Sequence, residues 1–248
     1  MSVVAIIPAR GNSKGIPRKN LRPFNDKPLI LHIIHTVQQI SMISDIYVTT
    51  EDSEISSLVQ KEGVKVINRP DYLSEDNVTL DPVIHHAVTE IEAQHTEGIS
   101  HVLTLQPTSP LISCHTIENI LNRALKNLKI DTIITAQEDT HLSWKKNDLS
   151  YTPNYKERLN RQYLEKYFKE TGAVVCSKRS CVTRTTRLGK TIDLEVVPMK
   201  ESIDIDTNDD WLMGEALLSS KSILFIVAGY PEIGMGHIYR SLQLANQF

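Results

Sequence analysis

The 248-residue chain lacks several features that define large classes of proteins. It has only three cysteines and no run of about 18 apolar residues, so neither a disulfide scaffold nor a transmembrane helix is expected. The formal net charge is −3, which gives no overall attraction to nucleic acid or to an anionic membrane. The N-terminus has no basic segment ahead of a long apolar stretch, so no signal peptide is expected and a cytoplasmic location is predicted.

Several well-known motifs are also missing. The chain has no G-x-x-x-x-G-K-[ST] phosphate loop and no G-x-G-x-x-G dinucleotide fingerprint. Its nine histidines form no H-E-x-x-H zinc motif, and there is no G-x-S-x-G nucleophile elbow. These absences exclude P-loop NTPases, typical dinucleotide-binding enzymes, zincin proteases and α/β-hydrolases.

The most informative segment present is the N-terminal junction VVAIIPARGNSKGIPRKNL. Val3–Ile7 is a β-branched run typical of a strand buried in a parallel sheet, and Pro8 ends it. The loop that follows has two glycines and several cations between Arg10 and Lys19. Glycines let the backbone approach phosphate, and cations offset its charge. The loop therefore predicts triphosphate binding and attack at a phosphorus, with a solvated basic turn as the alternative.

Strands and helices are expected to alternate along most of the chain. Further strands are predicted at 45–50, 64–68, 101–105, 132–136, 172–177 and 191–198. Helices are predicted at 28–40, 53–61, 80–94, 116–128 and 211–218. This order predicts an α/β fold with a doubly wound, mostly parallel sheet, in one domain that spans residues 1–220.

Two segments interrupt this alternation. Residues 138–170 are polar and tyrosine-rich without clean periodicity, which predicts an inserted arm that acts as a lid or a dimerisation element. A new strand is predicted at 223–228, followed by a glycine-containing loop and a helix. Such a unit cannot bury its own faces, so 222–248 is predicted to begin a truncated second α/β module. A terminal strand and helix that complete the first domain are the alternative.

The segment SIDIDT at 202–207 is a second candidate site. In a strand, alternate residues share a face, so Asp204 and Asp206 would project together. Two such carboxylates, with phosphate oxygens and water, suit Mg²⁺ or another divalent cation. A solvated strand edge followed by a helix cap is the alternative.

Two proline-containing turns offer further polar groups at strand ends. QPTSP at 106–110 leaves Gln106, Thr108 and Ser109 available for hydrogen bonds. Arg69, before Pro70, offers a guanidinium to a carboxylate or phosphate. Ordinary turn residues are the alternative in each case.

Five segments, in this order and spacing, are similar to a known family: PARGNSKGIPRKNL, NRPDYLSEDN, LQPTSPL, NRQ and SIDIDT. Over about residues 2–220 the chain resembles the CMP-sialic acid synthetases, or acylneuraminate cytidylyltransferases, including relatives that act on legionaminic and pseudaminic acids. The resemblance implies a nucleotidyltransferase (Rossmann-like) fold and a homodimer. It also implies Mg²⁺-dependent transfer of CMP from CTP to the anomeric hydroxyl of a nonulosonic acid, with release of pyrophosphate.

The resemblance implies roles for three groups of residues. The group that holds the triphosphate comprises Arg10, Ser13, Lys14 and Lys19. The metal ligands are Asp204 and Asp206. Residues associated with cytidine, the order of the loop, the sugar or the partner subunit's side of the site are Asn12, Asn20, Arg69, Gln106, Arg161 and Gln162.

Two departures from the family pattern lie near the expected sugar pocket. Ile112 stands where the family often has a basic residue, and Glu170-Thr171-Gly172 replaces an Asn-Gly segment. The tail PEIGMGHIYRSLQLA resembles the start of a hydrolase and glycosyltransferase family of pseudaminic acid pathways. Together these features favour a legionaminic or pseudaminic type of sugar over N-acetylneuraminate. The alternatives are another acidic keto-sugar, such as 3-deoxy-octulosonate, or a non-catalytic CTP- or sugar-binding module.

Overall fold

The computed structural model describes residues 2–94, 98–221, 223–230 and 234–246. The chain divides into two compact units, Met1–Leu218 and Ser219–Phe248.

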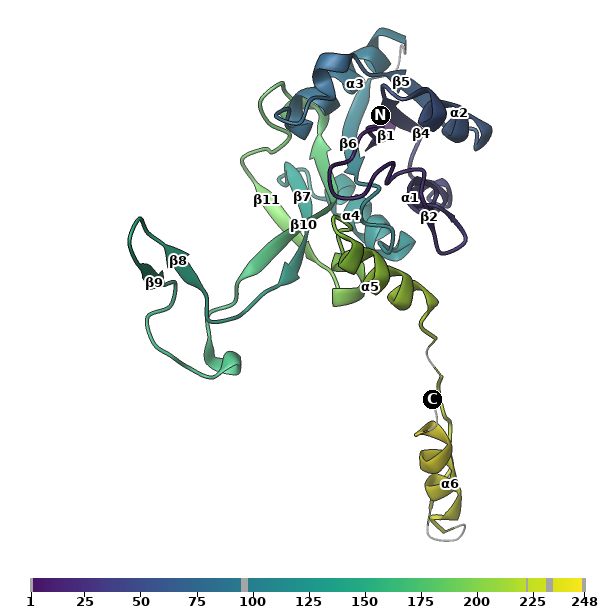
Figure 1. Cartoon of the computed structure of the whole chain (residues 1–248), viewed down its shortest axis with the longest axis vertical. Helices are drawn as coiled ribbons and strands as arrows, with labels where there is room; N and C mark the ends of the chain where they lie inside the picture. The colour runs from purple at the N-terminus through teal and green to yellow at the C-terminus, as the bar shows by residue number, and fades with distance from the viewer. Residues whose placement is uncertain (1, 95–97, 222, 231–233, 247–248) are drawn as a thin grey trace. The chain divides into compact units, whose positions relative to one another are not determined.

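A seven-stranded sheet forms the centre of the first unit, with the strand order β11-β7-β10-β6-β1-β4-β5 (Figure 1). Its strands are β1 (Ser2–Pro8), β4 (Asp45–Thr50), β5 (Lys65–Asn68), β6 (Ile99–Leu105), β7 (Thr132–Glu138), β10 (Phe168–Lys178) and β11 (Ile192–Val196). β10 is antiparallel to both β6 and β7, and the other neighbouring pairs are parallel. The predicted α/β fold with a doubly wound, mostly parallel sheet is confirmed.

Helices cover both faces of this sheet. Successive side chains of β1 point to opposite faces, so they enter two different hydrophobic clusters. Ala5 and Ile7 belong to one cluster, which also contains buried residues of α1 (Leu29–Gln38), α2 (Ser53–Lys61) and α4 (Cys114–Lys126). Val4 and Ile6 belong to the other cluster, with buried residues of α3 (Leu80–Gln94). The carboxyl end of β1 therefore lies between two packed layers, and the loop that follows it starts from a rigid position.

A short hairpin and the last helix of this unit form a third cluster beside the first loop. The hairpin consists of β2 (Pro23–Phe24) and β3 (Lys27–Pro28), and the helix is α5 (Asn208–Ser219). The rings of Phe24 and Trp211 pack edge to face with centroids 5.2 Å apart. Ile205 is fully buried in the same cluster, which places the SIDIDT segment against the first loop.

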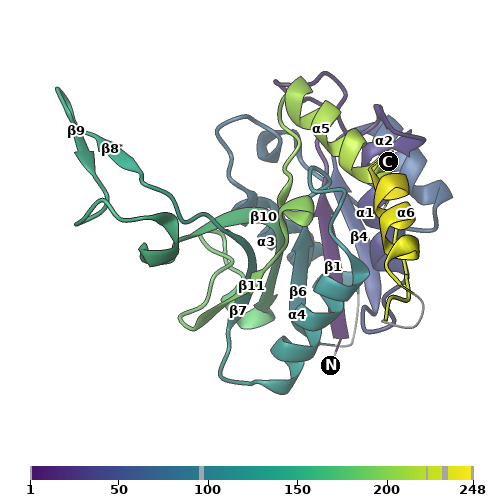
Figure 2. The ribbon, with the colours of Figure 1, turned by 90° about the horizontal axis from the view of Figure 1, so that it is seen from below.

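The inserted arm leaves the sheet after β7 and returns through β10. It contains a small hairpin, β8 (Trp144–Lys146) and β9 (Tyr151–Pro153), and the 3₁₀ turn η2 (Arg161–Tyr163). Both Figure 1 and Figure 2 show the hairpin extending away from the central sheet. The strands run further into the predicted arm than expected, because β10 pairs with β7 from Phe168 opposite Glu138.

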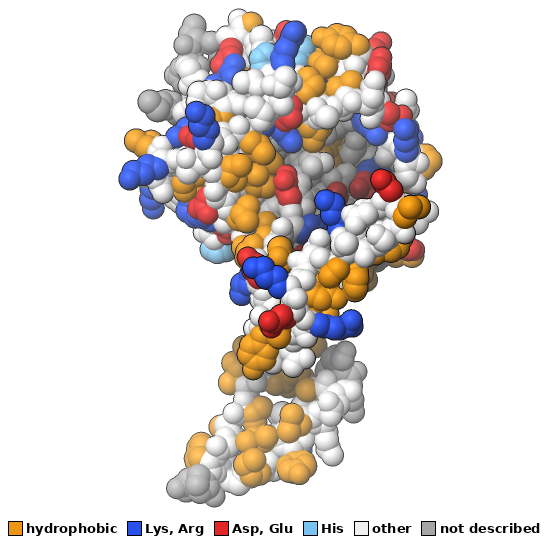
Figure 3. Space-filling view, turned by 90° about the vertical axis from the view of Figure 1, so that its left-hand side faces the viewer, with side chains coloured by type: hydrophobic (Ala, Val, Ile, Leu, Met, Phe, Trp, Pro, Cys, Tyr) orange, Lys and Arg blue, Asp and Glu red, His pale blue; other side chains and the backbone are white. Residues whose placement is uncertain are grey.

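The second unit contains one helix, α6 (Gly236–Ala245), within its described residues. The strand predicted at 223–228 is wrong, since these residues form no β-ladder in the described part of the chain. A β-branched run forms a strand only where a neighbouring strand accepts its hydrogen bonds. Leu224 and Ile226 are 83% and 89% exposed, and hydrophobic side chains are prominent on this unit in the lower part of Figure 3. Across the described ranges, no helix combines the length and the apolar character needed to cross a bilayer.

Candidate active site

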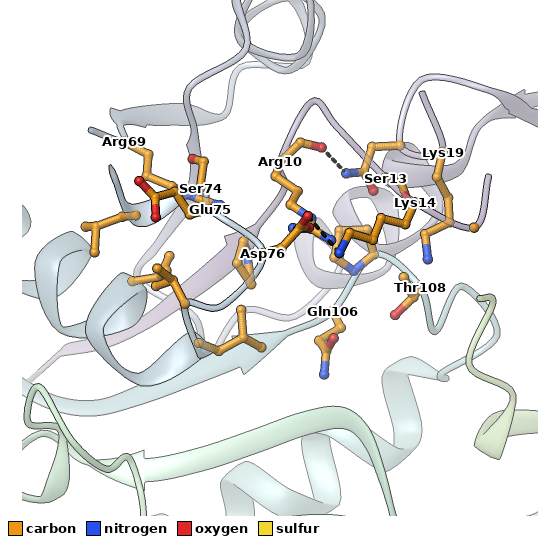
Figure 4. Close-up of a pocket in the computed structure, with 18 of the residues that line it drawn as sticks. Arg10, Ser13, Lys14, Lys19, Arg69, Ser74, Glu75, Asp76, Gln106 and Thr108 are labelled. Carbon is orange, nitrogen blue, oxygen red and sulfur yellow. Dashed lines mark hydrogen bonds and ion pairs between the residues drawn. The ribbon is translucent and has the colours of Figure 1, made fainter. Parts of the chain in front are cut away.

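A cavity of about 430 Å³ lies at the carboxyl ends of β1, β5 and β6. The chain passes from β1 to β4 and β5 on one side and then returns to β6 on the other side of β1. This is the switch point of a doubly wound sheet, where ligands bind in such folds. The lining residues come from the loop after β1, the segment between β5 and α3, and the QPTSP turn (Figure 4).

The loop after β1 is held in place by two hydrogen bonds to its backbone. The Asn20 side-chain amide donates to the carbonyl of Arg10 at 3.0 Å, and the Gly11 N–H donates to Glu51 Oε1 at 2.7 Å. The other oxygen of Glu51 accepts from the Ser74 hydroxyl at 2.8 Å. Glu51 therefore joins the first loop to the loop between β5 and α3. Sequence analysis missed Glu51, although its place directly after a predicted strand at the same sheet edge was a usable signal.

Two of the expected phosphate-binding cations share one carboxylate. Arg10 Nη1 and Lys14 Nζ each lie 2.8 Å from an oxygen of Asp76, and Figure 4 shows Asp76 between them. These two bonds lower the pKa of Asp76, with Lys14 the larger cause. Asp76 belongs to NRPDYLSEDN, a segment that sequence analysis used only for family resemblance.

The third expected cation joins the first loop to the SIDIDT segment. Lys19 is buried, with 8% of its surface exposed, and donates to the Ile205 carbonyl at 2.6 Å and to Asp206 Oδ1 at 2.9 Å. A Cβ atom added to Gly15 would lie only 2.1 Å from the carbonyl oxygen of Asp206. The two motifs recognised separately in the sequence are thus packed directly against each other. Arg18 has a different role, because its guanidinium pairs with Asp52 and Glu54 outside this cavity.

Asp204 and Asp206 both reach solvent, as the predicted alternation requires, while Ile205 between them is buried. The predicted strand is wrong, however, since residues 203–206 have no regular secondary structure and pair with no strand of the described chain. The alternation comes from the packing of Ile205 beside Phe24 and Trp211.

The pKa of Asp204 is raised, chiefly because surrounding protein desolvates its carboxylate and also because Asp206 is negatively charged. The Thr108 hydroxyl and Lys19 act in the opposite direction. Two neighbouring carboxylates under mutual repulsion fit Mg²⁺, which commonly takes one or two protein carboxylates and completes its shell with phosphate and water. Within the described residues, no cluster of three or more His, Cys, Asp or Glu side chains could form a closed metal site.

Arg69 supplies a buried positive charge to the cavity wall. It is only 4% exposed, and its Nη2 donates to the Thr49 carbonyl at 2.6 Å. Burial lowers its pKa to about 10, against the opposing effect of Glu51, so the guanidinium stays protonated at neutral pH. Opposite this wall, the Gln106 side-chain amide donates to the carbonyl of Gly172 at 2.9 Å. Gly172 has a φ of +72°, and a Cβ there would lie 2.7 Å from that amide nitrogen.

The cavity brings together most of the residues predicted from the sequence. Those that line it are Arg10, Ser13, Lys14, Lys19, Asn20, Arg69, Gln106 and Asp206. Asn12 lies instead in an adjacent hollow, and Asp204 is beside the cavity without lining it. Arg161 and Gln162 are exposed on η2 in the arm and do not line this cavity.

The two departures from the family pattern differ in their relation to the cavity. Ile112 is 2% exposed in the hydrophobic core, so its side chain does not line the cavity. Glu170-Thr171-Gly172 does reach the site, through the bond from Gln106 to Gly172. Lining residues that sequence analysis did not propose include Ser74, Glu75 and Asp76.

Known proteins are similar to this chain in sequence and in fold. The cytidylyltransferase family profile matches residues 4–189. The chain is 30% identical over 230 residues to the CMP-N,N'-diacetyllegionaminic acid synthase of Legionella pneumophila subsp. pneumophila, covering 88% of this chain and 97% of that protein. It is 26% identical over 231 residues to the N-acylneuraminate cytidylyltransferase of Escherichia coli O18:K1:H7, covering 89% of this chain.

Coverage differs among these relatives. The chain spans about half the length of several curated relatives that it matches, 53% in the Escherichia coli case. The structure of a CMP:2-keto-3-deoxy-manno-octonic acid synthetase complexed with CTP covers 88% of this chain and is itself covered to 99%, with a TM-score of 0.65 and 18% identity. That likeness shows a shared fold. On the extent of the profile match and the identity to these relatives, the chain belongs to the cytidylyltransferase family.

Proposed function

We propose that this protein transfers CMP from CTP to the anomeric hydroxyl of a nonulosonic acid and releases pyrophosphate. The observation that carries the proposal is the packing of the cationic first loop against the Asp204–Asp206 segment, through Lys19 and Gly15. The loop cations and the two carboxylates thus lie at one sheet edge, which supports roles in binding phosphate and a divalent metal. Two sequence relatives, named N-acylneuraminate cytidylyltransferase and CMP-N,N'-diacetyllegionaminic acid synthase, support the same reaction class.

In this reaction, the sugar hydroxyl attacks the α-phosphorus in line. A new O–P bond forms, the bond to the β-phosphate oxygen breaks, the hydroxyl loses its proton and pyrophosphate leaves with the electron pair. Arg10 and Lys14 bind the departing phosphates, and Lys19 holds the Asp206 carboxylate in position. Asp204 and Asp206 would hold Mg²⁺, which neutralises phosphate charge when bound. No described side chain is assigned as the general base.

For the sugar, we propose a legionaminic or pseudaminic type. Support comes from the 30% identity to the legionaminic relative over almost its full length and from the Glu170-Thr171-Gly172 segment beside Gln106. The test is pyrophosphate release from CTP and Mg²⁺ with legionaminic, pseudaminic, N-acetylneuraminic and 3-deoxy-octulosonic acids in parallel. Release with one sugar identifies the substrate. Silence with all four, together with calorimetric binding of CTP, would favour a binding module instead.

The metal assignment is tested separately with Asp204→Asn. Loss of one ligand should lower turnover by at least about 100-fold and weaken CTP binding far less, because the metal acts mainly on the reacting phosphate. Asp209→Asn, an exposed change in the first turn of α5, is the matched control and should leave turnover unchanged. Near-normal turnover of Asp204→Asn would refute the assignment.

We also propose a homodimer in which the arm of one subunit completes the site of the other. The arm exposes several aromatic side chains, including Trp144 at 53% and Tyr163 at 69%. Arg161 and Gln162 are also exposed there, outside the cavity of their own chain. Arg161→Ala and Asp204→Asn should each be inactive alone, and mixing them should restore activity, because one site in each mixed dimer then has both residues. A monomer in sedimentation, or no recovery on mixing, would contradict the proposal.

A further inference from the structure

A carboxylate of the protein lies between the two cations that would bind the phosphates. Arg10 Nη1 and Lys14 Nζ contact different oxygens of Asp76, both at 2.8 Å. The two cations are therefore paired with a carboxylate of the protein, which comes from the segment between β5 and α3. Figure 4 shows the three side chains meeting in the cavity.

The other cations near the first loop are neutralised by different groups. Lys19 pairs with Asp206, and Arg18 pairs with Asp52 and Glu54. Asp76 is accordingly matched to Arg10 and Lys14, which are the more exposed of the four cations that line the cavity, since Lys19 and Arg69 are buried.

These ion pairs are also placed where a ligand can break them. The side chains are 37% exposed for Arg10, 75% for Lys14 and 51% for Asp76. Ion pairs exposed to this degree are weak and screened by solvent. Ser74, two residues earlier, is tied to Glu51, so the segment has a fixed base from which the Asp76 side chain can turn away.

We propose that Asp76 is a resident counter-anion that the β- and γ-phosphates of a triphosphate must displace, and that this competition weakens triphosphate binding. This inference rests on the proposed function for the identity of the ligand. A β,γ-diphosphate carries more negative charge than one carboxylate and offers several acceptor oxygens to both cations. A single phosphate offers less charge and fewer acceptor oxygens, so it leaves the two ion pairs of Asp76 intact and its binding does not depend on them.

The same competition has a consequence after the reaction. Pyrophosphate leaves behind the two cations that Asp76 paired with before, so the carboxylate competes with the product for them. Asp76 therefore raises the concentration of CTP needed for binding and also eases the release of pyrophosphate.

The test is isothermal calorimetry on the full chain with sodium tripolyphosphate, CTP and CMP, without sugar. Asp76→Asn should bind tripolyphosphate and CTP about three- to tenfold more tightly than the unmodified protein, as expected for the loss of two exposed competing ion pairs. Its affinity for CMP should stay within about twofold. Inhibition by added pyrophosphate during turnover should strengthen to the same extent as tripolyphosphate binding.

Glu75→Gln is the matched control, because Glu75 lines the same cavity and forms no ion pair with a described residue. It removes the same charge and should tighten tripolyphosphate binding clearly less than Asp76→Asn does, because it frees no cation from an ion pair. An equal gain in tripolyphosphate affinity in both variants would show that only the net charge of the cavity matters, which would overturn the inference. Weaker binding in Asp76→Asn would show that Asp76 helps to hold the ligand, which also overturns it.

Thermal melting of Asp76→Asn and Asp76→Ala verifies that both variants fold, as expected for a half-exposed side chain. The calorimetry is independent of the proposed reaction. Tighter tripolyphosphate binding without turnover on any sugar would leave the inference standing and remove the proposed function. Normal turnover of Asp76→Asn, together with unchanged tripolyphosphate affinity, would overturn the inference and leave the proposed function standing.

Discussion

The carboxylate of Glu51 accepts a hydrogen bond from the backbone N–H of Gly11 at 2.7 Å. The same side chain accepts from the Ser74 hydroxyl and lies 3.8 Å from the guanidinium of Arg69. One acidic residue after β4 thereby positions two loops that line the cavity. It lines no part of the cavity itself, so its effect on a ligand is indirect.

Glu51→Ala should therefore weaken CTP binding by about tenfold or more. The substitution leaves the Gly11 N–H and the Ser74 hydroxyl without their acceptor, and such losses typically cost about 1–3 kcal/mol. Calorimetry with CTP measures the change. Glu51→Gln, which keeps one acceptor oxygen, should recover part of the affinity, and Glu90→Ala on the exposed side of α3 serves as a control. CTP affinity equal to that of the control would show that Glu51 does not position the loops.

Gly15→Ala should reduce turnover strongly, by at least about tenfold. Its Cβ would collide with the carbonyl of Asp206 at 2.1 Å, so the first loop and the carboxylate segment must move apart. Steady-state pyrophosphate release measures the loss. Gly98→Ala is the matched change, since a Cβ there meets nothing within 4 Å, and it should leave activity intact. Full activity of Gly15→Ala would mean that the close approach is dispensable.

Lys19 and Lys14 should differ in their effect on stability. Lys19→Met leaves the buried Ile205 carbonyl without its donor, which should cost about 1–3 kcal/mol and lower the Tm by several degrees. Lys14→Met removes an exposed side chain and should leave the Tm unchanged while weakening CTP binding. Scanning calorimetry and CTP titration separate the two effects. Equal melting temperatures for the two variants would show that the buried hydrogen bonds of Lys19 contribute nothing.

Asp204→Asn should raise the stability of the metal-free protein at neutral pH. Because the pKa of Asp204 is raised on folding, the folded state binds its proton more tightly than the unfolded state. The contribution of this group to the free energy of unfolding therefore falls as the pH rises from the ordinary Asp pKa of 3.8 through the folded pKa.

Melting curves of both proteins between pH 7 and the ordinary Asp pKa of 3.8 provide the measurement. The advantage of Asp204→Asn should shrink toward the acidic end, where Asp204 becomes protonated. Added Mg²⁺ should stabilise the unmodified protein more than the variant, since the ligand binds the folded state. A variant less stable than the unmodified protein at pH 7 would contradict this expectation.

The sequence and the structure agree most closely where a local pattern is also a packing pattern. The strand at 45–50 and the helices at 53–61 and 80–94 have the predicted bounds. The apolar side chains of the helices repeat with the helical period, and the strand has a short apolar run that is buried on both faces of the sheet. Two predicted strands are absent, at Ile223–Ala228 and in SIDIDT. A strand requires a partner elsewhere in the chain, and local composition does not supply one.

The candidate site could be predicted only in part, because only some of its residues are brought together by the order of the strands. The first loop and Gln106 follow strands, and the sheet order brings those strand ends together. Asp76 lies 66 positions from Arg10, and nothing in the sequence near either residue indicates that they meet. The positions of Asn12 and Ile112 likewise depend on how their loops turn after the strand.

By itself, the sequence determined the α/β class, the cationic loop after β1 and the paired carboxylates of SIDIDT. These are local properties, because hydrophobic period and loop chemistry are encoded within about ten to twenty residues. Only the tertiary structure decided that Lys19 would be buried against Asp206, 187 positions away, and that Asp76 would neutralise Arg10 and Lys14. Those contacts depend on the strand order and on the packing of loops across one sheet edge, which no single segment of the chain specifies.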